Sequence, residues 1–380
     1  MPRIEPLLES LRSNYPGPCL IFDLAALRDA ADALARIGQA CGVRFIAAAK
    51  ALPAPSLLDM AVHAGDGFDV SNVGELRRLR DWSRAGGSTL RIPYVSMSGP
   101  ALLSGAGADA ADRCVDCLSI NVETYTQLAA LDSLSGWATE VEIGARIGLE
   151  LPAPASGAPC AMSRFGFSEH DPAGLAAIAA HPRFAVLHCH VEGDSRQPGS
   201  HVAAASRLVG LARKLKASLR RINLGGGFRS ESVSDIEYMC RQVRAIVPAG
   251  VEIIFEPGAW LTARAGYAFC RLLWTRDRPD LKATLAAVDL SRECHLRWTI
   301  PQLLRWWGAP PPRETIIVTG PTCYEADHLG TFRCGGSQFA APAGDAGWLL
   351  FGGISGYAAA FNTSFNGIER ARVLAIGNAR

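Results

Sequence analysis

The chain has 380 residues, of which 49% are hydrophobic and 19% charged, so it can bury the cores of two ordinary domains. Its 38 basic and 36 acidic residues nearly balance, which argues against a protein that binds nucleic acid through a basic surface. It has no uncharged apolar run of about 18 residues and no apolar signal sequence near its first residues, so we expect a cytoplasmic protein without a membrane span.

Eight short apolar segments follow one another between residues 44 and 258. The expected strands are 44–50, 67–71, 91–96, 117–121, 142–148, 185–191, 221–227 and 252–258. Helical spacing of apolar residues is found over 55–64, 73–82, 123–134, 201–220 and 234–247. Buried parallel strands that alternate with helices indicate an α/β fold, and eight such units predict a (β/α)8 TIM-type barrel.

The composition changes after residue 258, where aromatic and β-branched segments are rich in glycine and proline. Helical spacing is scarce there, so we predict a second, mostly β domain of the barrel or sandwich type. Residues 19–27 precede the barrel and can supply a strand to this domain. The predicted division is a barrel over 26–258 and a β domain made from 1–25 and 259–380.

Residues that carry chemistry gather at the ends of the predicted barrel strands, where the active sites of such barrels lie. In chain order they are Lys50, Asp69, Arg146, His190, the triplet Gly225, Gly226 and Gly227, and the segment from Glu256 to Gly258. One such residue means little, but their shared position at six strand ends predicts a single active site.

Four of these features have both a functional and an ordinary interpretation. Lys50 can be a Schiff-base amine or a lysine that extends from a strand end into solvent. The glycine triplet can bind a phosphate through backbone N–H groups, or it can form a tight turn. Glu256 can face a pyridine nitrogen and keep it protonated, or it can cap a turn. His190 can stack on a flat cofactor ring or be a hydrogen-bonded core histidine.

Metal binding is the rival chemistry for this end of the barrel. His188 lies two residues from His190, but no third ligand is evident, so we expect no metal and disfavour a metal hydrolase. The eleven cysteines are scattered, and a buried, reduced set is expected. Cys323 is the exception because it follows Gly-Pro-Thr in a loop, where it can be a proton donor, a metal ligand or an ordinary thiol.

Taken together and in order, the motifs make the chain similar to the fold-type III decarboxylases that depend on pyridoxal 5′-phosphate (PLP). This family contains the ornithine, diaminopimelate and carboxynorspermidine decarboxylases. The motifs are AAAKA at 47–51, FDVSNVGEL at 68–76, SRFGF at 163–167, LHCHV at 187–191, NLGGGF at 223–228, FEPG at 255–258, GPTCYEAD at 320–327 and FNGI at 365–368. Each motif alone is weak, but the conjunction is specific and covers nearly the whole chain.

The resemblance implies that the protein decarboxylates an amino-acid-type substrate, with PLP held on Lys50 as an internal aldimine. His190 would stack on the pyridine ring, and Glu256 would pair with the ring nitrogen. The other implied cofactor contacts are Asp69, Arg146, Gly225, Gly226, Gly227, Gly258 and Tyr357.

The resemblance also implies a homodimer with shared active sites. Cys323 of the partner subunit would protonate the quinonoid intermediate after carbon dioxide leaves. The residues that follow this cysteine, Tyr324, Glu325 and Asp327, would lie at the substrate.

Three departures from the family pattern bear on the substrate. Ala259 stands where the family's E-P-G-R has arginine, Tyr324 stands where an acid usually follows the cysteine, and HVEGDSRQPGS replaces a shorter H-V-G-S. They favour a diamine or polyamine precursor, or a conjugated amino acid of siderophore or secondary metabolism. Two alternatives stay open: an amino-acid racemase with Tyr324 as its base, and a catalytically silent regulatory binding protein that lacks the arginine.

Overall fold

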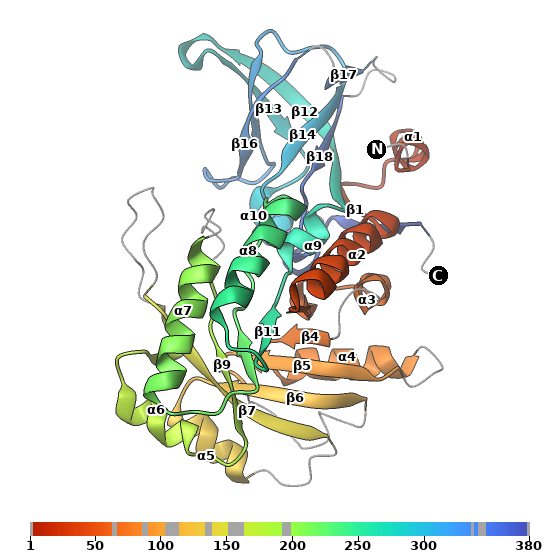
Figure 1. Cartoon of the computed structure of the whole chain (residues 1–380). Coiled ribbons are helices and arrows are strands. Elements are labelled where there is room, and N and C mark those ends of the chain that lie inside the picture. The colour runs from red at the N-terminus through yellow and green to blue at the C-terminus, as the bar shows by residue number, and fades with distance from the viewer. Residues whose placement is uncertain are drawn as a thin grey trace. The chain divides into compact units, whose positions relative to one another are not determined.

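The computed structural model describes residues 3–62, 67–85, 90–102, 114–133, 139–150, 163–191, 199–335, 338–340 and 347–377. Its contacts divide the chain into two compact units, whose elements are labelled in Figure 1. The barrel unit comprises Ala31–Lys50 and Ala61–Gly258. The β unit comprises Met1–Ala30, Ala51–Met60 and Ala259–Arg380.

A parallel sheet forms the barrel unit, with the strand order β2-β11-β10-β9-β7-β6-β5-β4-β3. The bounds are β2 Arg44–Phe45, β3 Ala47–Ala48, β4 Gly67–Val70, β5 Ile92–Ser98, β6 Val115–Val122, β7 Glu140–Gly148, β9 Phe184–His188, β10 Arg221–Asn223 and β11 Glu252–Phe255, with a short β8, Phe167–Ser168, beside β7. β2 and β3 are successive pieces of one segment, and they pair with β11 and β4 at the two ends of the sheet. The sheet therefore closes on itself, which confirms the predicted barrel.

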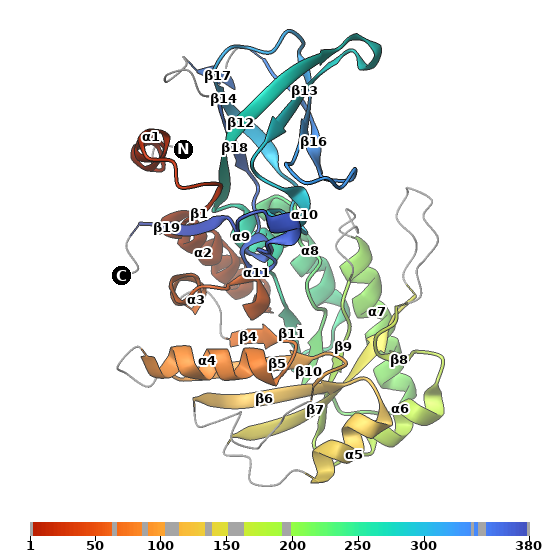
Figure 2. The ribbon, with the colours of Figure 1, turned by 180° about the vertical axis from the view of Figure 1, so that it is seen from behind.

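Helices follow the barrel strands, and Figure 2 shows several of them outside the curved sheet. The bounds are α2 Leu24–Cys41, α3 Pro55–Val62, α4 Val73–Ala85, α5 Tyr125–Ser133, α6 Pro172–Ala179, α7 Gly199–Lys214 and α8 Val233–Ile246. α7 ends well before the predicted residue 220, because Lys216 adopts a left-handed backbone conformation with a φ of 51°. Leu208 and Leu211 are buried as expected, but Leu215 lies beyond the helix and is only half-buried.

The β unit is built on a nine-stranded sheet. The strands are β1 Cys19–Asp23, β12 Gly266–Arg278, β13 Ala283–Val288, β14 Gln302–Trp307, β15 Thr315–Thr319, β16 His328–Arg333, β17 Phe339–Ala340, β18 Trp348–Gly352 and β19 Arg372–Ile376, and the short helices are α1 Glu5–Ser13, α9 Ala259–Ala263, α10 Arg292–His295 and α11 Gly356–Ala360. β1 pairs antiparallel with β12 and parallel with β19. The amino-terminal strand therefore belongs to the mostly β unit, as the sequence predicts.

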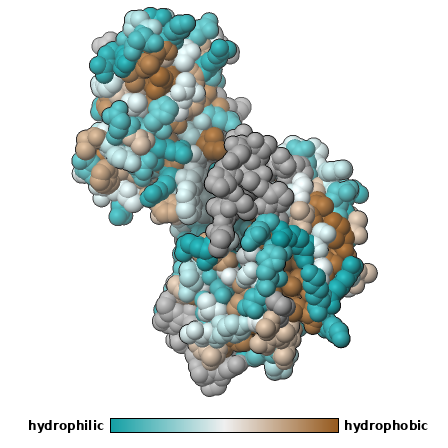
Figure 3. Space-filling model, turned by 90° about the vertical axis from the view of Figure 1, so that its left-hand side faces the viewer, coloured by the Kyte–Doolittle hydropathy of each residue, from teal (hydrophilic) through white to brown (hydrophobic). Residues whose placement is uncertain are grey.

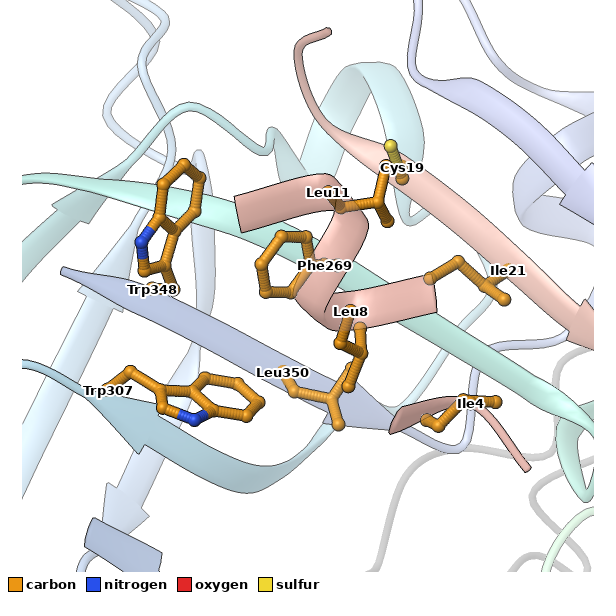
Figure 4. Packing of buried hydrophobic residues seen from close by; sticks show 9 residues of the cluster. All are labelled: Ile4, Leu8, Leu11, Cys19, Ile21, Phe269, Trp307, Trp348 and Leu350. Carbon is orange, nitrogen blue, oxygen red and sulfur yellow. The ribbon is translucent and has the colours of Figure 1, made fainter. Parts of the chain in front are cut away.

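Apolar side chains from α1 and β1 complete the core of this sheet (Figure 4). Phe269 of β12 stacks on Trp348 of β18 with ring centroids 5.3 Å apart. The buried cluster is Ile4, Leu8, Leu11, Cys19, Ile21, Phe269, Trp307, Trp348 and Leu350. Burial of these side chains attaches the first residues of the chain to a sheet whose other strands begin at residue 266.

Ten cysteines lie among the described residues, all of them free thiols, and only Cys323 of these is exposed. Cys160 lies outside the described residues. Hydrophilic and hydrophobic side chains are mixed on the face drawn in Figure 3. Among the helices in the described ranges, none has the length and apolar character needed to cross a membrane.

Charged residues cross-link the amino ends of three barrel strands. The guanidinium group of Arg221 on β10 donates to Glu142 on β7 and, at 2.6 Å, to Glu252 on β11. The side chains of Arg221 and Glu142 are 13% and 3% exposed, whereas that of Arg220, which also contacts Glu142 at 2.7 Å, is 57% exposed. Because a buried carboxylate without its partner is costly, Arg221 should contribute far more than Arg220 to stability.

Replacing Arg221 with alanine should lower the free energy of unfolding by about 3 kcal/mol, because it leaves the buried Glu142 carboxylate with one exposed partner. Arg220→Ala is the matched control and should cost less than about 1 kcal/mol, as exposed ion pairs do. Urea denaturation of both variants measures the difference. Equal losses would contradict the assignment of Arg221 as the main partner.

Candidate active site

Lys50 and Asp69 form an ion pair at the carboxyl ends of β3 and β4. Lys50 lies in the short 3-10 turn Ala49–Ala51 that follows β3, rather than in the strand that the sequence predicted. Pairing of the two strands places Ala48 opposite Asp69, and the Lys50 Nζ donates to Asp69 Oδ2. The Lys50 side chain is 33% exposed and that of Asp69 is 2% exposed. An accessible amine is thus held by a buried carboxylate.

Glu256 is a buried carboxylate that several polar side chains surround. Ser96 on β5 donates to its Oε1 at 2.9 Å, Asn223 on β10 donates to the same atom at 2.7 Å, and His188 Nε2 lies 3.5 Å from Oε2. Burial opposes its charge, but the attraction of His188 and Lys50 outweighs burial and lowers the pKa of Glu256 to about 2. Glu256 therefore stays ionised inside the barrel.

Asp69 differs from Glu256 although both are buried at this end of the barrel. Burial, together with repulsion from the Glu256 charge, raises the pKa of Asp69 to about 7, against the attraction of Lys50. Its second oxygen, Oδ1, is buried and has no hydrogen-bond partner among the residues that the structure describes. The charge of Asp69 therefore depends on whether Lys50 carries its positive charge.

The glycine triplet follows β10 and adopts a backbone that other residues rarely take. Gly225 and Gly227 have φ angles of 65° and 97°. A Cβ atom at Gly225 would lie 2.6 Å from the carbonyl oxygen of Cys189, and one at Gly227 would lie 2.5 Å from that of Val191. Asn223 Oδ1 accepts from the Gly225 N–H at 2.9 Å. Only glycine fits here, because the loop after β10 passes so close to the backbone of Cys189 and Val191 after β9.

His190 lies two residues beyond the end of β9, next to this triplet. Its Nδ1 accepts from the Gly226 N–H at 3.3 Å, so the neutral ring carries its proton on Nε2. Part of its side chain is exposed. Even so, the surrounding protein and the cations Lys50 and Arg146 lower the pKa of His190 to about 3. The imidazole is therefore uncharged at neutral pH.

Arg146 also reaches this end of the barrel, from the late part of β7. Its Nη1 donates to Glu123 Oε1 at 2.7 Å, and its guanidinium group lies 4.4 Å from the ring centroid of Phe165. Phe165 belongs to the SRFGF motif. The structure thus brings together, in one unit, Lys50, Asp69, Arg146, His190, the glycine triplet and Glu256 at the strand ends where the sequence predicted them.

The other predicted site residues, apart from Gly258 of the barrel unit, belong to the β unit. Cys323, Tyr324 and Glu325 are exposed in the loop after β15. Asp327 is buried, and its carboxylate accepts from Thr322 Oγ1 at 2.7 Å, from the Arg292 N–H at 2.6 Å and from Ser291 Oγ at 3.1 Å. It therefore holds the loop in place. Tyr357 on α11 is half-buried, with its ring edge-on to Trp298 at 5.5 Å.

The sequence did not predict four residues that contact Glu256 or Gly226 in the structure. They are Ser96, His188, His201 and Asn223. His188 was weighed only as a metal ligand, but the structure buries it beside Glu256. Only one group of described residues has metal-ligand spacing, and it is Cys117, Glu140 and Glu142. That group lies at the amino ends of β6 and β7, where Arg220 and Arg221 already bind Glu142.

Comparison with known proteins gives one family and a set of relatives. A sequence model of the family described as "Pyridoxal-dependent decarboxylase, pyridoxal binding domain" matches residues 26–263. Diaminopimelate decarboxylase of Pseudomonas aeruginosa is 27% identical over 349 residues, which cover 86% of this chain and 81% of that protein. The enzyme of the same name from Deinococcus radiodurans is 28% identical over 334 residues, or 84% and 81% of the two chains.

Solved structures resemble the fold at lower identity. Diaminopimelate decarboxylase of Helicobacter pylori complexed with L-lysine has a TM-score of 0.74 at 16% identity and covers 97% of this chain and 94% of that one. Lysine/ornithine decarboxylase of Vibrio vulnificus complexed with putrescine has a TM-score of 0.71 at 18% identity, with 98% of both chains covered. These structures support the arrangement of a barrel with a second, mostly β part.

The short distance between Gly227 and the Val191 carbonyl oxygen predicts how a substitution at Gly227 changes the stability of the protein. Gly227→Ala should lower the free energy of unfolding by about 2 kcal/mol, because the new Cβ meets a backbone carbonyl in a left-handed conformation. Gly210→Ala in α7 is the matched control, since a Cβ there has no neighbour within 4 Å. That change should stabilise the helix by about 0.5 kcal/mol. Urea denaturation measures both, and a neutral Gly227→Ala would contradict the close approach.

Proposed function

Because this chain belongs to the pyridoxal-dependent decarboxylases, we propose that its barrel unit holds PLP on Lys50 and removes the α-carboxylate of an amino-acid substrate. The family makes the protein a carboxy-lyase with PLP as its cofactor. The observation that carries the proposed site is the meeting of an accessible amine, an ionised buried carboxylate and a glycine cradle at one end of the barrel.

These residues fit the chemical groups of PLP. The cofactor carries an aldehyde, a pyridine nitrogen and a phosphate, and each needs a different partner. Lys50 offers the amine for the aldehyde, and Glu256 offers the carboxylate for the ring nitrogen. The triplet Gly225 to Gly227 offers backbone that an anion can approach closely. His190, neutral and partly exposed, offers a flat face for the ring.

Bound PLP supplies an electron sink that accepts the electron pair left when the bond to the carboxylate breaks. Glu256 would hold a proton on the ring nitrogen, because Ser96, Asn223 and His188 keep its own carboxylate ionised. Asp69 neutralises the Lys50 ammonium, and its raised pKa lets it take up the proton that Lys50 loses on reacting with an aldehyde. Arg146 and Glu123 form part of the polar rim of the site.

We place the proton that replaces carbon dioxide on Cys323 of the partner subunit, in a homodimer with shared active sites. The support is that this thiol is exposed in a loop, whereas the other described cysteines are buried. Asp327 braces that loop, so we assign substrate contact to Tyr324 and Glu325 and loop support to Asp327. Gly258, at the end of the barrel unit, is a further proposed cofactor contact, and residues 26–258 are the proposed cofactor domain of a cytoplasmic enzyme.

For the substrate we propose a diamine or polyamine precursor, or a conjugated amino acid of siderophore or secondary metabolism. Tyr324 presents an exposed phenol, so the position directly after Cys323 gives a distal ammonium group no carboxylate, and Glu325 is the acidic residue of this loop that remains for the substrate. The relatives named above act on diaminopimelate by name, and that compound is the first alternative substrate.

Lys50→Ala should abolish the visible absorbance of the PLP-loaded protein and its release of carbon dioxide, because it removes the amine that we propose binds the cofactor aldehyde. Lys214→Ala, at the exposed end of α7, is the matched control and should keep both. Absorbance before and after borohydride, together with trapped carbon dioxide, provides the measurement. A wild-type protein that binds no added PLP would end the proposal, and turnover without carbon dioxide would favour the racemase.

Turnover of L-ornithine should be weak, whereas one of meso-diaminopimelate, carboxynorspermidine or a citryl-conjugated diamino acid should be decarboxylated efficiently. Tyr324→Asp should raise kcat/KM for L-ornithine by about tenfold, since a carboxylate adds a charge-assisted partner for the distal ammonium. Tyr324→Phe is the control and should leave ornithine turnover low. Rapid turnover of ornithine by the wild-type protein would overturn the argument from Tyr324.

A further inference from the structure

His201 is a buried histidine that the proposed chemistry does not use. It lies in the first turn of α7 and is 5% exposed. Its ring stacks on Phe228 with centroids 4.8 Å apart and an interplanar angle of 10°, and it meets the edge of Phe255 at 5.8 Å. Its Nε2 lies 2.8 Å from the carbonyl oxygen of Gly226, in the middle of the glycine triplet.

The partner of His201 determines its hydrogen-bonding state. A carbonyl oxygen can only accept, so Nε2 of His201 must carry the proton and donate. Burial lowers the pKa of His201, although the bond to Gly226 opposes this shift, so the ring is a neutral donor at physiological pH. Phe228 and Phe255 restrict the ring, so the direction of its N–H is determined by packing.

Gly226 is held on two sides by two different imidazoles. Its carbonyl oxygen accepts from His201, and its N–H donates to His190 Nδ1 at 3.3 Å. A Cβ at Gly226 would lie 2.8 Å from the Glu256 carbonyl oxygen and 3.2 Å from His190 Cε1, so the backbone has little room to shift. His201, Gly226 and His190 thus form one connected chain from α7 to the site.

The same peptide unit joins the Gly226 carbonyl to the Gly227 N–H. A trans peptide is planar, and its C=O and N–H point in opposite directions. Holding the carbonyl toward His201 therefore holds the Gly227 N–H away from it. Within the described part of the chain, that N–H donates to no protein acceptor. The described residues thus leave this N–H oriented and available, which is the arrangement of an anion-binding amide.

We propose that His201 is a positioning residue for the phosphate of the cofactor, acting through the Gly226–Gly227 peptide. The inference rests on the proposed PLP site and deepens it. His201 touches neither cofactor nor substrate. Its removal should weaken recognition of the phosphate specifically, because the affected donor is the Gly227 N–H.

Two substitutions separate this role from simple packing. His201→Phe keeps a flat ring against Phe228 but has no hydrogen-bond donor. His201→Gln gives up the ring, but its amide nitrogen can reach the position of Nε2 and restore the bond to Gly226. His201→Asn is also polar but is too short to reach, and it replaces His201→Phe if that variant does not fold, as judged by urea denaturation.

The measurement is the Kd of each full-length variant for PLP and for pyridoxal, which has the aldehyde and the ring but no phosphate. Absorbance of the Lys50-bound cofactor reports both. His201→Phe should raise the Kd for PLP about tenfold and change the Kd for pyridoxal less than about twofold, as loss of one charge-assisted contact predicts. His201→Gln should restore the Kd for PLP to within about threefold of wild type.

Other outcomes overturn the inference. Unchanged PLP affinity in His201→Phe, or equal weakening for PLP and pyridoxal, would assign His201 to packing alone. If His201→Gln binds PLP no more tightly than His201→Asn, the hydrogen bond to Gly226 does not account for the effect of His201. If the wild-type protein binds PLP and the variants behave in these ways, only this inference fails. If the wild-type protein does not bind PLP, the proposed function fails with it.

Discussion

The structure of the site depends on one buried charge, the carboxylate of Glu256. An ion inside a barrel is costly unless neutral donors and an opposite charge replace the water it loses. Here Ser96, Asn223 and His188 meet it from three different strands, and Lys50 faces it with a positive charge. The barrel must therefore close with the right strand register before the cost of burying this carboxylate is offset by its partners. Its ionisation in turn raises the pKa of Asp69, so the two carboxylates of the site are kept in different states.

Register shows how the barrel assembles these donors. Pairing of β9 with β10 places His188 opposite Asn223, and pairing of β7 with β9 places Arg146 opposite His188. On the other side, pairing of β4 with β5 places Asp69 opposite Ser96. Parallel neighbours in one closed sheet thus form rows of polar side chains at the same height. This explains why residues far apart in the sequence make one site on a single unit.

The sequence predicted those parts of the molecule that depend on local pattern. Short apolar strands, amphipathic helices and residues of unusual type at six of the eight strand ends could be found without knowing which strands are neighbours. Ser96, Asn223 and His201 could not, because serine, asparagine and a helical histidine are ordinary residues until the fold brings them to Glu256 and Gly226. Ends of elements were also missed. Lys50 lies in a 3-10 turn rather than in the strand. α7 stops at Lys214, because Lys216 adopts a left-handed backbone conformation there.

The uncharged state of His190 fits the proposal that this site holds a protonated cofactor ring. A cationic imidazole against a protonated pyridine would be repelled, whereas a neutral one can stack without that penalty. Partial desolvation by the surrounding protein, together with the charges of Lys50 and Arg146, lowers the pKa of His190 far below neutrality, and its Nδ1 already accepts from the Gly226 N–H. Desolvation and the positive charges of Lys50 and Arg146 thus keep His190 uncharged, as its proposed stacking on a cofactor ring requires, while Glu256 remains the anion that we propose for the ring nitrogen.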